Sequence, residues 1–372
     1  MKKRRLKRKV KYSLILIILL VLLVIINGNS VDSKLKRLNY SKSAILEIKK
    51  NNIENEVLEN KYSKTLEVAI TSKNYKKDNL DIYLSVDNVN DKKQIKNINS
   101  LAEIGYDKDI IEKVYKKLDN EQIQYLTNYT HVDNLESYLD YKIFKANRLE
   151  RYINYKAEKR DLTYKEIVLN VNMDLDKEFY EEPNTIKEPD DMLVLVNKYN
   201  KLPDDYEAKD LVEIDSKYTV SKMLLNKEAK ENFEEMCTDA KSINLIIKAI
   251  SAYRTKEYQT NLYNDYIEDK GFEMAESFSA RPRHSEHETG LAIDVASGTN
   301  SYTTFENTEE YKWIKQNAQN YGFIVRYKKE YENVTGYKFE AWHLRYVGKD
   351  VAKYIYEHDI TFEEYYAMFL DK

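Results

Sequence analysis

The chain has 372 residues, more than one typical domain of about 100–200 residues, which predicts two or more units. Its 60 basic and 63 acidic residues give a formal net charge of -3, so it lacks the basic excess of nucleic-acid-binding proteins and we expect no nucleic-acid partner. With 8 glycines and 4 prolines, long low-complexity linkers are excluded. The single cysteine, Cys237, excludes an internal disulfide and a thiolate metal site.

Residues 1–30 differ in composition from the rest of the chain. Eight basic residues and no acidic residue lie within 2–11, and residues 14–26 are an unbroken run of Leu, Ile and Val. Such a run suits a signal peptide or, with its neighbours, a membrane-spanning helix, and no small-residue cleavage site follows it. We therefore expect an uncleaved signal anchor, that is, an N-terminal transmembrane helix. The basic segment predicts a cytoplasmic N-terminus and a single pass through the cell membrane, with everything after Ser30 extracellular.

Residues 31–155 show helical periodicity and a weak internal repeat. The segment that begins at Tyr40 resembles the segment that begins at Tyr106, and a second pair of similar segments follows, with offsets of 66 to 69 residues. Ser41 and Asp107 are candidate N-caps, since each precedes apolar residues at helical spacing. We expect a helical region built from two copies of one small unit.

A change of pattern marks the C-terminal domain. Residues 156–191 are acidic, contain two prolines, and are expected to form a linker. Apolar runs typical of buried strands then alternate with helical segments: strands at 193–196, 243–253 and 291–296, and helices at 228–240, 255–270 and 311–321. Because no regular strand–helix–strand repeat appears, we expect residues 192–372 to form a small mixed domain of the α+β class.

One short segment of this domain combines a histidine, a glycine and an aspartate. His287 and Asp294 lie seven residues apart, and Gly290 between them permits a sharp turn of the backbone. After the turn, aliphatic residues alternate with Ala292, Asp294 and Ala296, so on a strand Asp294 would lie between two alanines. A carboxylate in such a place is nearly buried and needs a partner, and a metal ion shared with His287 would supply one. The alternative is a solvated aspartate on a half-exposed strand.

A second segment adds Glu340 and His343. Two imidazoles and one carboxylate form a tripod suited to catalytic zinc with an open fourth position, and Glu340 would then serve as a general base. On a regular strand Glu340 and His343 would face opposite sides of the sheet, so a bulge or a turn is required between them.

These two segments resemble those of a known family, the VanY-type D-alanyl-D-alanine carboxypeptidases, which are zinc peptidases. The resemblance covers about residue 192 to the C-terminus and rests on the motifs Ser285-x-His287-x-x-Gly290-x-Ala292-x-Asp294 and Glu340-x-Trp342-His343. It implies that His287, Asp294 and His343 bind Zn2+ and that Glu340 is the catalytic base.

The resemblance also implies three substrate-binding residues. Ser251-Ala252-Tyr253-Arg254 is similar to the family's substrate-binding segment, and the matching positions for substrate contact are Arg254, Gln259 and Ser285. A guanidinium beside a helix N-terminus is a suitable site for the free C-terminal carboxylate that an exopeptidase must recognise. Without the resemblance, the alternative interpretation is that Arg254 belongs to a surface ion pair. For Gln259 the alternative is an exposed residue on a helix.

The chain departs from the family pattern at two positions, with Arg283 where the family usually has glycine and Glu288 where it usually has glutamine. Neither change removes a ligand, but both make substrate preference less certain. His284 does not have the ligand spacing to Asp294 and is not expected to bind metal.

The function expected from these motifs is removal of the C-terminal D-alanine from peptidoglycan stem peptides by a D,D-carboxypeptidase. Two alternatives stay open: an L,D-carboxypeptidase that acts on tetrapeptide stems, and a wall-binding protein without catalysis. Residues 31–155 would be a spacer or a wall-binding region. A serine-type carboxypeptidase is excluded because the chain contains no Lys-Thr-Gly.

Overall fold

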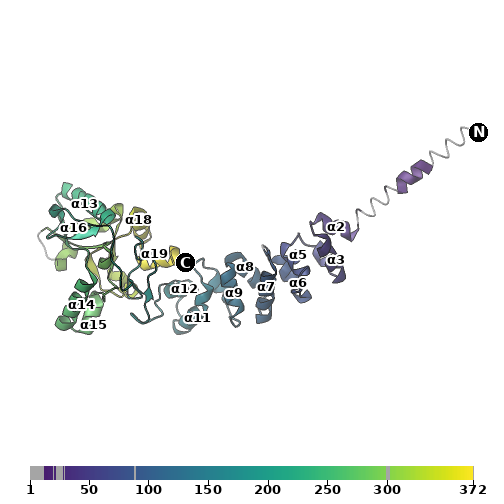
Figure 1. The fold of residues 1–372 in the computed structure, drawn as a ribbon, viewed down its shortest axis with the longest axis horizontal. Coiled ribbons are helices and arrows are strands. Elements are labelled where there is room, and N and C mark those ends of the chain that lie inside the picture. Colours follow the sequence, from purple (N-terminus) through teal and green to yellow (C-terminus); the bar gives the residue numbers. More distant parts are fainter. Residues whose placement is uncertain are drawn as a thin grey trace, which may run out of the picture. The chain divides into compact units, whose positions relative to one another are not determined.

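The computed structural model describes residues 12–19, 21, 28, 30–87, 89–298 and 302–371. By its internal contacts the chain divides into two compact units, residues 1–168 and 169–372 (Figure 1). The predicted basic segment 2–11 and most of the second half of the predicted anchor, residues 20 and 22–26, lie outside the described residues. Within the described part of the chain, no helix has both the length and the apolar character that crossing a bilayer requires. The N-terminal transmembrane helix therefore stays a prediction.

The first unit is helical over its described residues. Its helices and 3-10 turns after residue 30 are α2 (Val31–Arg37), α3 (Lys42–Lys50), α4 (Glu54–Leu58), α5 (Lys64–Ile70), η1 (Lys77–Asn79), α6 (Leu80–Ser85), α7 (Lys92–Ile104), α8 (Lys108–Lys117), α9 (Asn120–Thr127), α10 (Leu135–Leu139), η2 (Ala146–Arg148) and α11 (Leu149–Glu158). The two predicted N-caps are confirmed, since Ser41 accepts the backbone N–H of Ala44 and Asp107 accepts that of Ile110.

Four tyrosines of this unit make matching hydrogen bonds in the segments whose sequences resemble each other. Each hydroxyl accepts a backbone N–H, and the distances are the same within each pair: 3.1 Å for Tyr40 with Ser63 and Tyr106 with Val132, 3.3 Å for Tyr83 with Lys76 and Tyr152 with Lys145. A buried tyrosine hydroxyl needs such a partner. The similar segments therefore share their local construction as well as their sequence.

Helix α12 (Tyr164–Asn172) spans the division between the units and occupies part of the predicted linker. Its buried side chains, Ile167, Val168 and Val171, give it a helical apolar face. The prediction of a linker over 156–191 depended on acidic composition and on Pro183 and Pro189, and both prolines lie after this helix.

The second unit mixes helices and short strands. Its strands are β1 (Asn184–Thr185), β2 (Asn200–Lys201), β3 (Leu211–Glu213), β4 (Leu224–Asn226), β5 (Ile247–Ser251), β6 (Ala292–Ser297), β7 (Phe323–Tyr327) and β8 (Glu340–Tyr346). Its helices are α13 (Lys227–Ser242), α14 (Lys256–Lys270), α15 (Phe272–Phe278), α16 (Glu309–Asn317), α17 (Glu332–Thr335), α18 (Lys349–His358) and α19 (Phe362–Phe369). Five 3-10 turns join them: η3 (Ser216–Tyr218), η4 (Glu286–Thr289), η5 (Tyr302–Asn307), η6 (Ala318–Tyr321) and η7 (Lys329–Tyr331).

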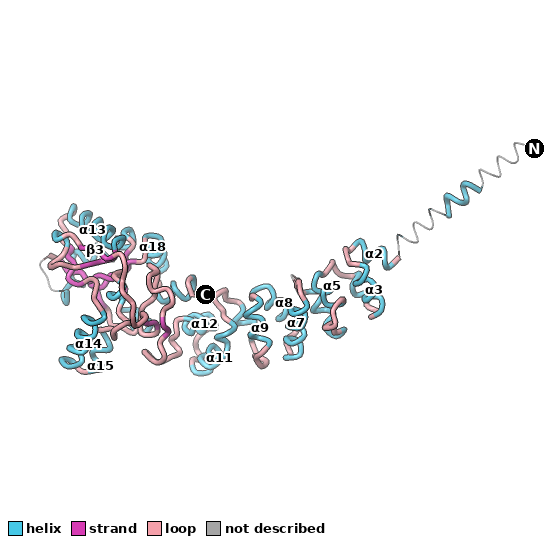
Figure 2. Tube along the Cα trace, viewed as in Figure 1, coloured by secondary structure: helices cyan, strands magenta, loops and turns pink. Residues whose placement is uncertain are grey.

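The central sheet has the strand order β5-β6-β8-β7, and every neighbouring pair is antiparallel. Helix α13 lies on one side of these strands and α14 and α15 on the other (Figure 2). The buried side chains Phe233 and Met236 of α13 form one core with Ile293, Val295 and Leu344 of the sheet. Because side chains alternate along a strand, the residues between these aliphatics face the opposite side. The predicted mixed class is confirmed, and that opposite face carries the site described below.

The apolar run 193–196 is not the strand that its sequence predicts. Residues 194–196 are buried but irregular, and the backbone carbonyl of Val194 accepts from a side chain. Nη2 of Arg345 donates to the carbonyl oxygens of Met192 and Val194 at 2.9 and 2.8 Å. Buried backbone groups need hydrogen bonds, and a distant arginine supplies them here in place of a neighbouring strand.

Candidate metal centre

The register of three strands brings polar side chains together on the face of the sheet opposite α13. Asp294 in β6 pairs with Ser251 in β5 on one side and with His343 in β8 on the other. Directly paired residues of antiparallel strands project to the same side. Asp294 therefore lies between its two neighbours, and Leu291, Ile293 and Val295 enter the core as predicted.

His287 reaches this point from the 3-10 turn η4. The turn ends at Gly290, whose φ of 72° is a left-handed conformation, and a Cβ there would lie 2.5 Å from a side-chain carbon of Leu211. Nδ1 of His287 lies 2.7 Å from the carbonyl oxygen of Ala252. Since that oxygen can only accept, Nδ1 carries the hydrogen, and Nε2 is left to face Oδ2 of Asp294 at 3.2 Å.

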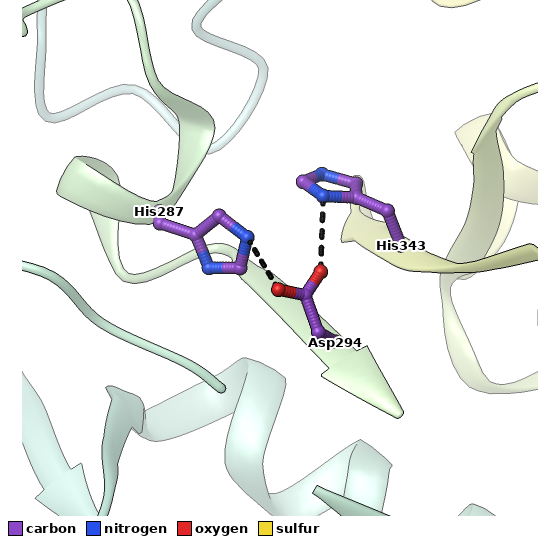
Figure 3. Close-up of side chains that lie close together, drawn as sticks. All are labelled: His287, Asp294 and His343. Atoms are coloured by element: carbon purple, nitrogen blue, oxygen red, sulfur yellow. Dashed lines mark ion pairs between the residues drawn. The ribbon is translucent and has the colours of Figure 1, made fainter. Parts of the chain in front are cut away.

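His343 faces Asp294 with Nδ1, whereas His287 faces it with Nε2. Nδ1 of His343 lies 3.2 Å from Oδ1 of Asp294 (Figure 3). Its Nε2 lies 3.2 Å from Oε2 of Glu286. His287, Asp294 and His343 thus offer three ligand atoms within 4.8 Å of one another, and all three residues are buried. Oδ1 of Asp294 is buried without a hydrogen bond, although Nδ1 of His343 is close to it. Two imidazole nitrogens and a carboxylate that has an unsatisfied oxygen fit a zinc ion, which is the predicted cofactor.

The protonation of the histidines follows from burial and from neighbouring charges. Burial, assisted by the nearby Arg254, lowers the pKa of His287 to about 4, so its ring is neutral at pH 7. Burial also opposes protonation of His343, but Asp294 and Glu286 outweigh it and raise the pKa of that ring to about 9. A metal ion must therefore displace a proton from Nδ1 of His343.

Glu340 begins strand β8 and lies just outside the group of three. Its Oε2 is 3.7 Å from Nδ1 of His343, and burial raises its pKa to about 8. The bulge that the sequence requires is present, because Tyr327 pairs with Glu340 whereas Val325 pairs with Leu344. The two extra residues on β8 turn Glu340 and His343 toward the same side.

The three residues expected to contact substrate also lie here. Nη2 of Arg254 donates to Oδ2 of Asp294 at 2.7 Å and to Oγ of Ser251 at 2.8 Å. Gln259 is 1% exposed and donates to the carbonyl oxygen of Ala280 at 2.8 Å, so the reading of an exposed helix residue is wrong. Ser285 is buried immediately before η4.

A cleft of about 620 Å³ holds all of these groups. One wall comes from α14, where Tyr258, Leu262 and Tyr266 follow each other at intervals of one helical turn. Met274 and Phe278 of α15 add to the apolar lining. The cleft is therefore polar at the sheet and apolar along the helices, which is typical of sites that bind small molecules or peptide ends.

The two departures from the family pattern occur together as a pair. Arg283 has a φ of 71°, an unusual conformation for a residue with a side chain, at the position where the family usually has glycine. The carboxylate of Glu288 accepts the backbone N–H of Arg283 at 2.6 Å and lies 3.3 Å from its Nη1. Arg283 and Glu288, the two residues that depart from the family pattern, are therefore hydrogen-bonded to each other.

Sequence reasoning missed the residues around the second histidine. Glu286 contacts His343, and the guanidinium groups of Arg326 and Arg345 both donate to its Oε1. Arg345 lies two residues after His343 on the same strand. Because side chains alternate along a strand, this spacing predicts that both lie on the same face of the sheet. Arg326 stands within the apolar run 323–327, which is a local signal of burial, whereas none marks Glu286.

Comparison with known proteins agrees with this geometry. Residues 222–349 match a family model described as VanY, D-alanyl-D-alanine carboxypeptidase. A relative named putative carboxypeptidase YodJ, from Bacillus subtilis, is 40% identical over 189 residues, which cover 49% of this chain and 69% of that protein.

Two solved structures are also similar to part of this chain. One, of the LdcB LD-carboxypeptidase, has 39% identity and a TM-score of 0.47 and covers 50% of this chain and 90% of that one. Another, of the D,D-pentapeptidase VanY from a VanB-type resistance cassette in complex with Zn(II), has 30% identity and a TM-score of 0.42 and covers 47% of this chain and 98% of that one. From the match over residues 222–349 and the 40% identity to its relative, the chain belongs to the VanY family of D-alanyl-D-alanine carboxypeptidases.

Proposed function

We propose that this protein is a zinc D,D-carboxypeptidase that removes the C-terminal D-alanine from peptidoglycan stem peptides. The observation that carries the proposal is the contact between Arg254 and Asp294, at 2.7 Å. It puts a guanidinium, which suits a free carboxylate, beside the three proposed ligands. A peptide whose terminal carboxylate lies at Arg254 has its last peptide bond at the metal centre, so the enzyme is an exopeptidase.

Each residue of the cleft has a distinct proposed role. His287, Asp294 and His343 hold the zinc ion, which when bound polarises the scissile carbonyl and acidifies water. Oε2 of Glu340 takes a proton from the attacking water, and that proton then passes to the amine of the leaving D-alanine as the C–N bond breaks. Gln259 and Ser285 line the cleft beside Arg254 and orient the terminal residue.

An L,D-carboxypeptidase is the second candidate, and the similar structures bear both names, so they do not decide between the two. Both substrates offer the same terminal carboxylate to Arg254. An L,D enzyme places a lysine or diaminopimelate residue directly before the scissile bond, and an acidic side chain such as that of Glu288 would suit the amine of that residue. Glu288 is 2% exposed and is bound to Arg283, so it is not available to a substrate. This favours the D,D substrate.

We further propose that residues 14–26 anchor the protein in the cell membrane, with the catalytic unit outside the cell. The support is the sequence of the N-terminus, eight basic residues followed by an unbroken apolar run. This location gives the enzyme access to the peptidoglycan stem peptides.

Zinc binding tests the ligands. His287→Ala and His343→Ala should each lose bound zinc, because each removes one of three ligands. His284→Ala is the matched control: its ring is also buried, but its Nδ1 bonds to the carbonyl oxygen of Asn197 at 2.8 Å, so zinc should be retained. Metal analysis of the purified proteins measures the outcome. Full zinc occupancy in both ligand variants would exclude the site.

The role of Glu340 predicts a different pattern. Glu340→Gln should keep its zinc, since Glu340 is not a ligand, while kcat falls by about 10²–10⁴-fold, the usual contribution of a general base. Steady-state kinetics together with metal analysis separates the two effects. Turnover at the wild-type rate in this variant would refute the assignment.

Substrate preference is tested with defined muropeptides. Incubation of the purified protein with pentapeptide and with tetrapeptide stems, followed by mass spectrometry, should show loss of one alanine from the pentapeptide only. Trimming of the tetrapeptide alone would contradict the D,D proposal in favour of the L,D candidate. An internal cut would contradict the exopeptidase.

Membrane anchoring is tested on intact cells. Added protease should digest the residues after Ser30, and the protein should fractionate with the membrane. A soluble secreted form that starts near Val31 would show that the apolar run is a cleaved signal.

A further inference from the structure

A second carboxylate, that of Glu286, is buried directly behind the proposed zinc ligands. The side chain is 1% exposed, and its two oxygens have different partners. Oε2 faces Nε2 of His343 at 3.2 Å, while Oε1 accepts hydrogen bonds from Nε of Arg326 at 2.7 Å and from Nη1 of Arg345 at 3.0 Å. The arginines fix the carboxylate, and the carboxylate is directed at the histidine.

The two arginines are themselves fixed by other parts of the unit. Both terminal nitrogens of Arg326 donate to Glu363, at 2.8 and 2.6 Å, and Glu363 belongs to the C-terminal helix α19. Arg345 donates to the backbone carbonyls of the 192–194 segment, as described above. The side chains of Glu286, Arg326, Arg345 and Glu363 are all buried, and their formal charges sum to zero. Buried charges are tolerated only when they are paired and hydrogen-bonded in this way.

The consequence concerns which nitrogen of His343 carries the hydrogen. Asp294 lies at Nδ1 and Glu286 at Nε2, each at 3.2 Å, so without a metal ion both nitrogens have a carboxylate acceptor. With zinc held by Asp294, the ring would keep one N–H, and Glu286, which can only accept, would hold it at Nε2. Nδ1 then has a free lone pair and faces Asp294. The opposite tautomer would direct a hydrogen at the metal and prevent binding.

We propose that Glu286 is a positioning residue that selects the zinc-binding tautomer of His343, and that the C-terminal helix α19 supports it through Glu363 and Arg326. The inference rests on the proposed zinc site but not on the substrate. Glu363 lies outside residues 222–349, the part of the chain that the family model matches, so the support comes from the chain's own C-terminal segment.

The first test is Glu286→Gln, which keeps the shape of the side chain. The two arginines need an acceptor, so the amide oxygen stays with them and the amide NH2 turns to Nε2 of His343. That nitrogen must then accept, and the hydrogen moves to Nδ1. Zinc affinity, measured by competition with a chelator, should fall by about 10–100-fold, the usual effect of losing an outer partner of a ligand. The absorption spectrum of the cobalt-substituted protein should change as well.

The second test separates positioning from stability on helix α19. Glu363→Gln sets an amide NH2 against Arg326 and should weaken zinc binding in the same direction, by about threefold to tenfold. Glu364→Ala is the matched control: it removes the capping box in which Glu364 accepts the backbone N–H of Thr361 at 2.7 Å, but does not contact Arg326. It should lower the Tm without changing zinc affinity.

The inference is wrong if Glu286→Gln binds zinc within about twofold of the wild type, or if Glu364→Ala weakens binding as much as Glu363→Gln. If Glu286→Gln does not fold, the comparison of the two α19 variants decides. Because affinity is measured without substrate, the outcome is independent of the proposed activity. A wild-type protein that binds zinc but leaves muropeptides intact contradicts the proposed function and not this inference.

Discussion

The burial of the Asp294 carboxylate is the constraint on which the rest of the site depends. A carboxylate on an inner strand of a covered sheet loses its hydration, and that loss is tolerated only if cationic or metal partners replace water. Asp294 is in contact with His287, His343 and Arg254, and these contacts outweigh burial and hold its pKa well below the usual value. The turn at Gly290, the strand register and the helix after Arg254 all converge on this one side chain.

The carboxylates around the centre are distinguished by their neighbours. Burial opposes ionisation of all of them. At Glu286 the guanidinium groups of Arg326 and Arg345 outweigh burial, so its pKa is lowered, whereas at Glu340 burial prevails and the pKa rises to about 8. A carboxylate that stays ionised suits a fixed hydrogen-bond acceptor, and one with a raised pKa suits proton transfer near neutral pH. The same residue type thus performs two tasks within one cleft.

The sequence was most informative where the structure is local. The segment from His287 to Asp294 contains its own turn and strand, and the bulge between Glu340 and His343 follows from their spacing. Contacts between distant residues were not predictable. The 193–196 run is irregular, and the carbonyl of Val194 accepts from the distant Arg345. Gln259 is buried, and its side-chain amide donates to the carbonyl of Ala280. The Arg283–Glu288 pair shows that two departures from a motif can compensate each other, which neither position reveals alone.

The central claim is that zinc is bound by Nε2 of His287, a carboxylate oxygen of Asp294 and Nδ1 of His343. Crystals of the zinc-loaded protein, with anomalous diffraction data collected on both sides of the zinc absorption edge, measure this directly. The account predicts one anomalous peak about 2.0–2.2 Å from each of those three atoms. A peak bonded to Nε2 of His343, or to His284, or the lack of any peak in this cleft would contradict it.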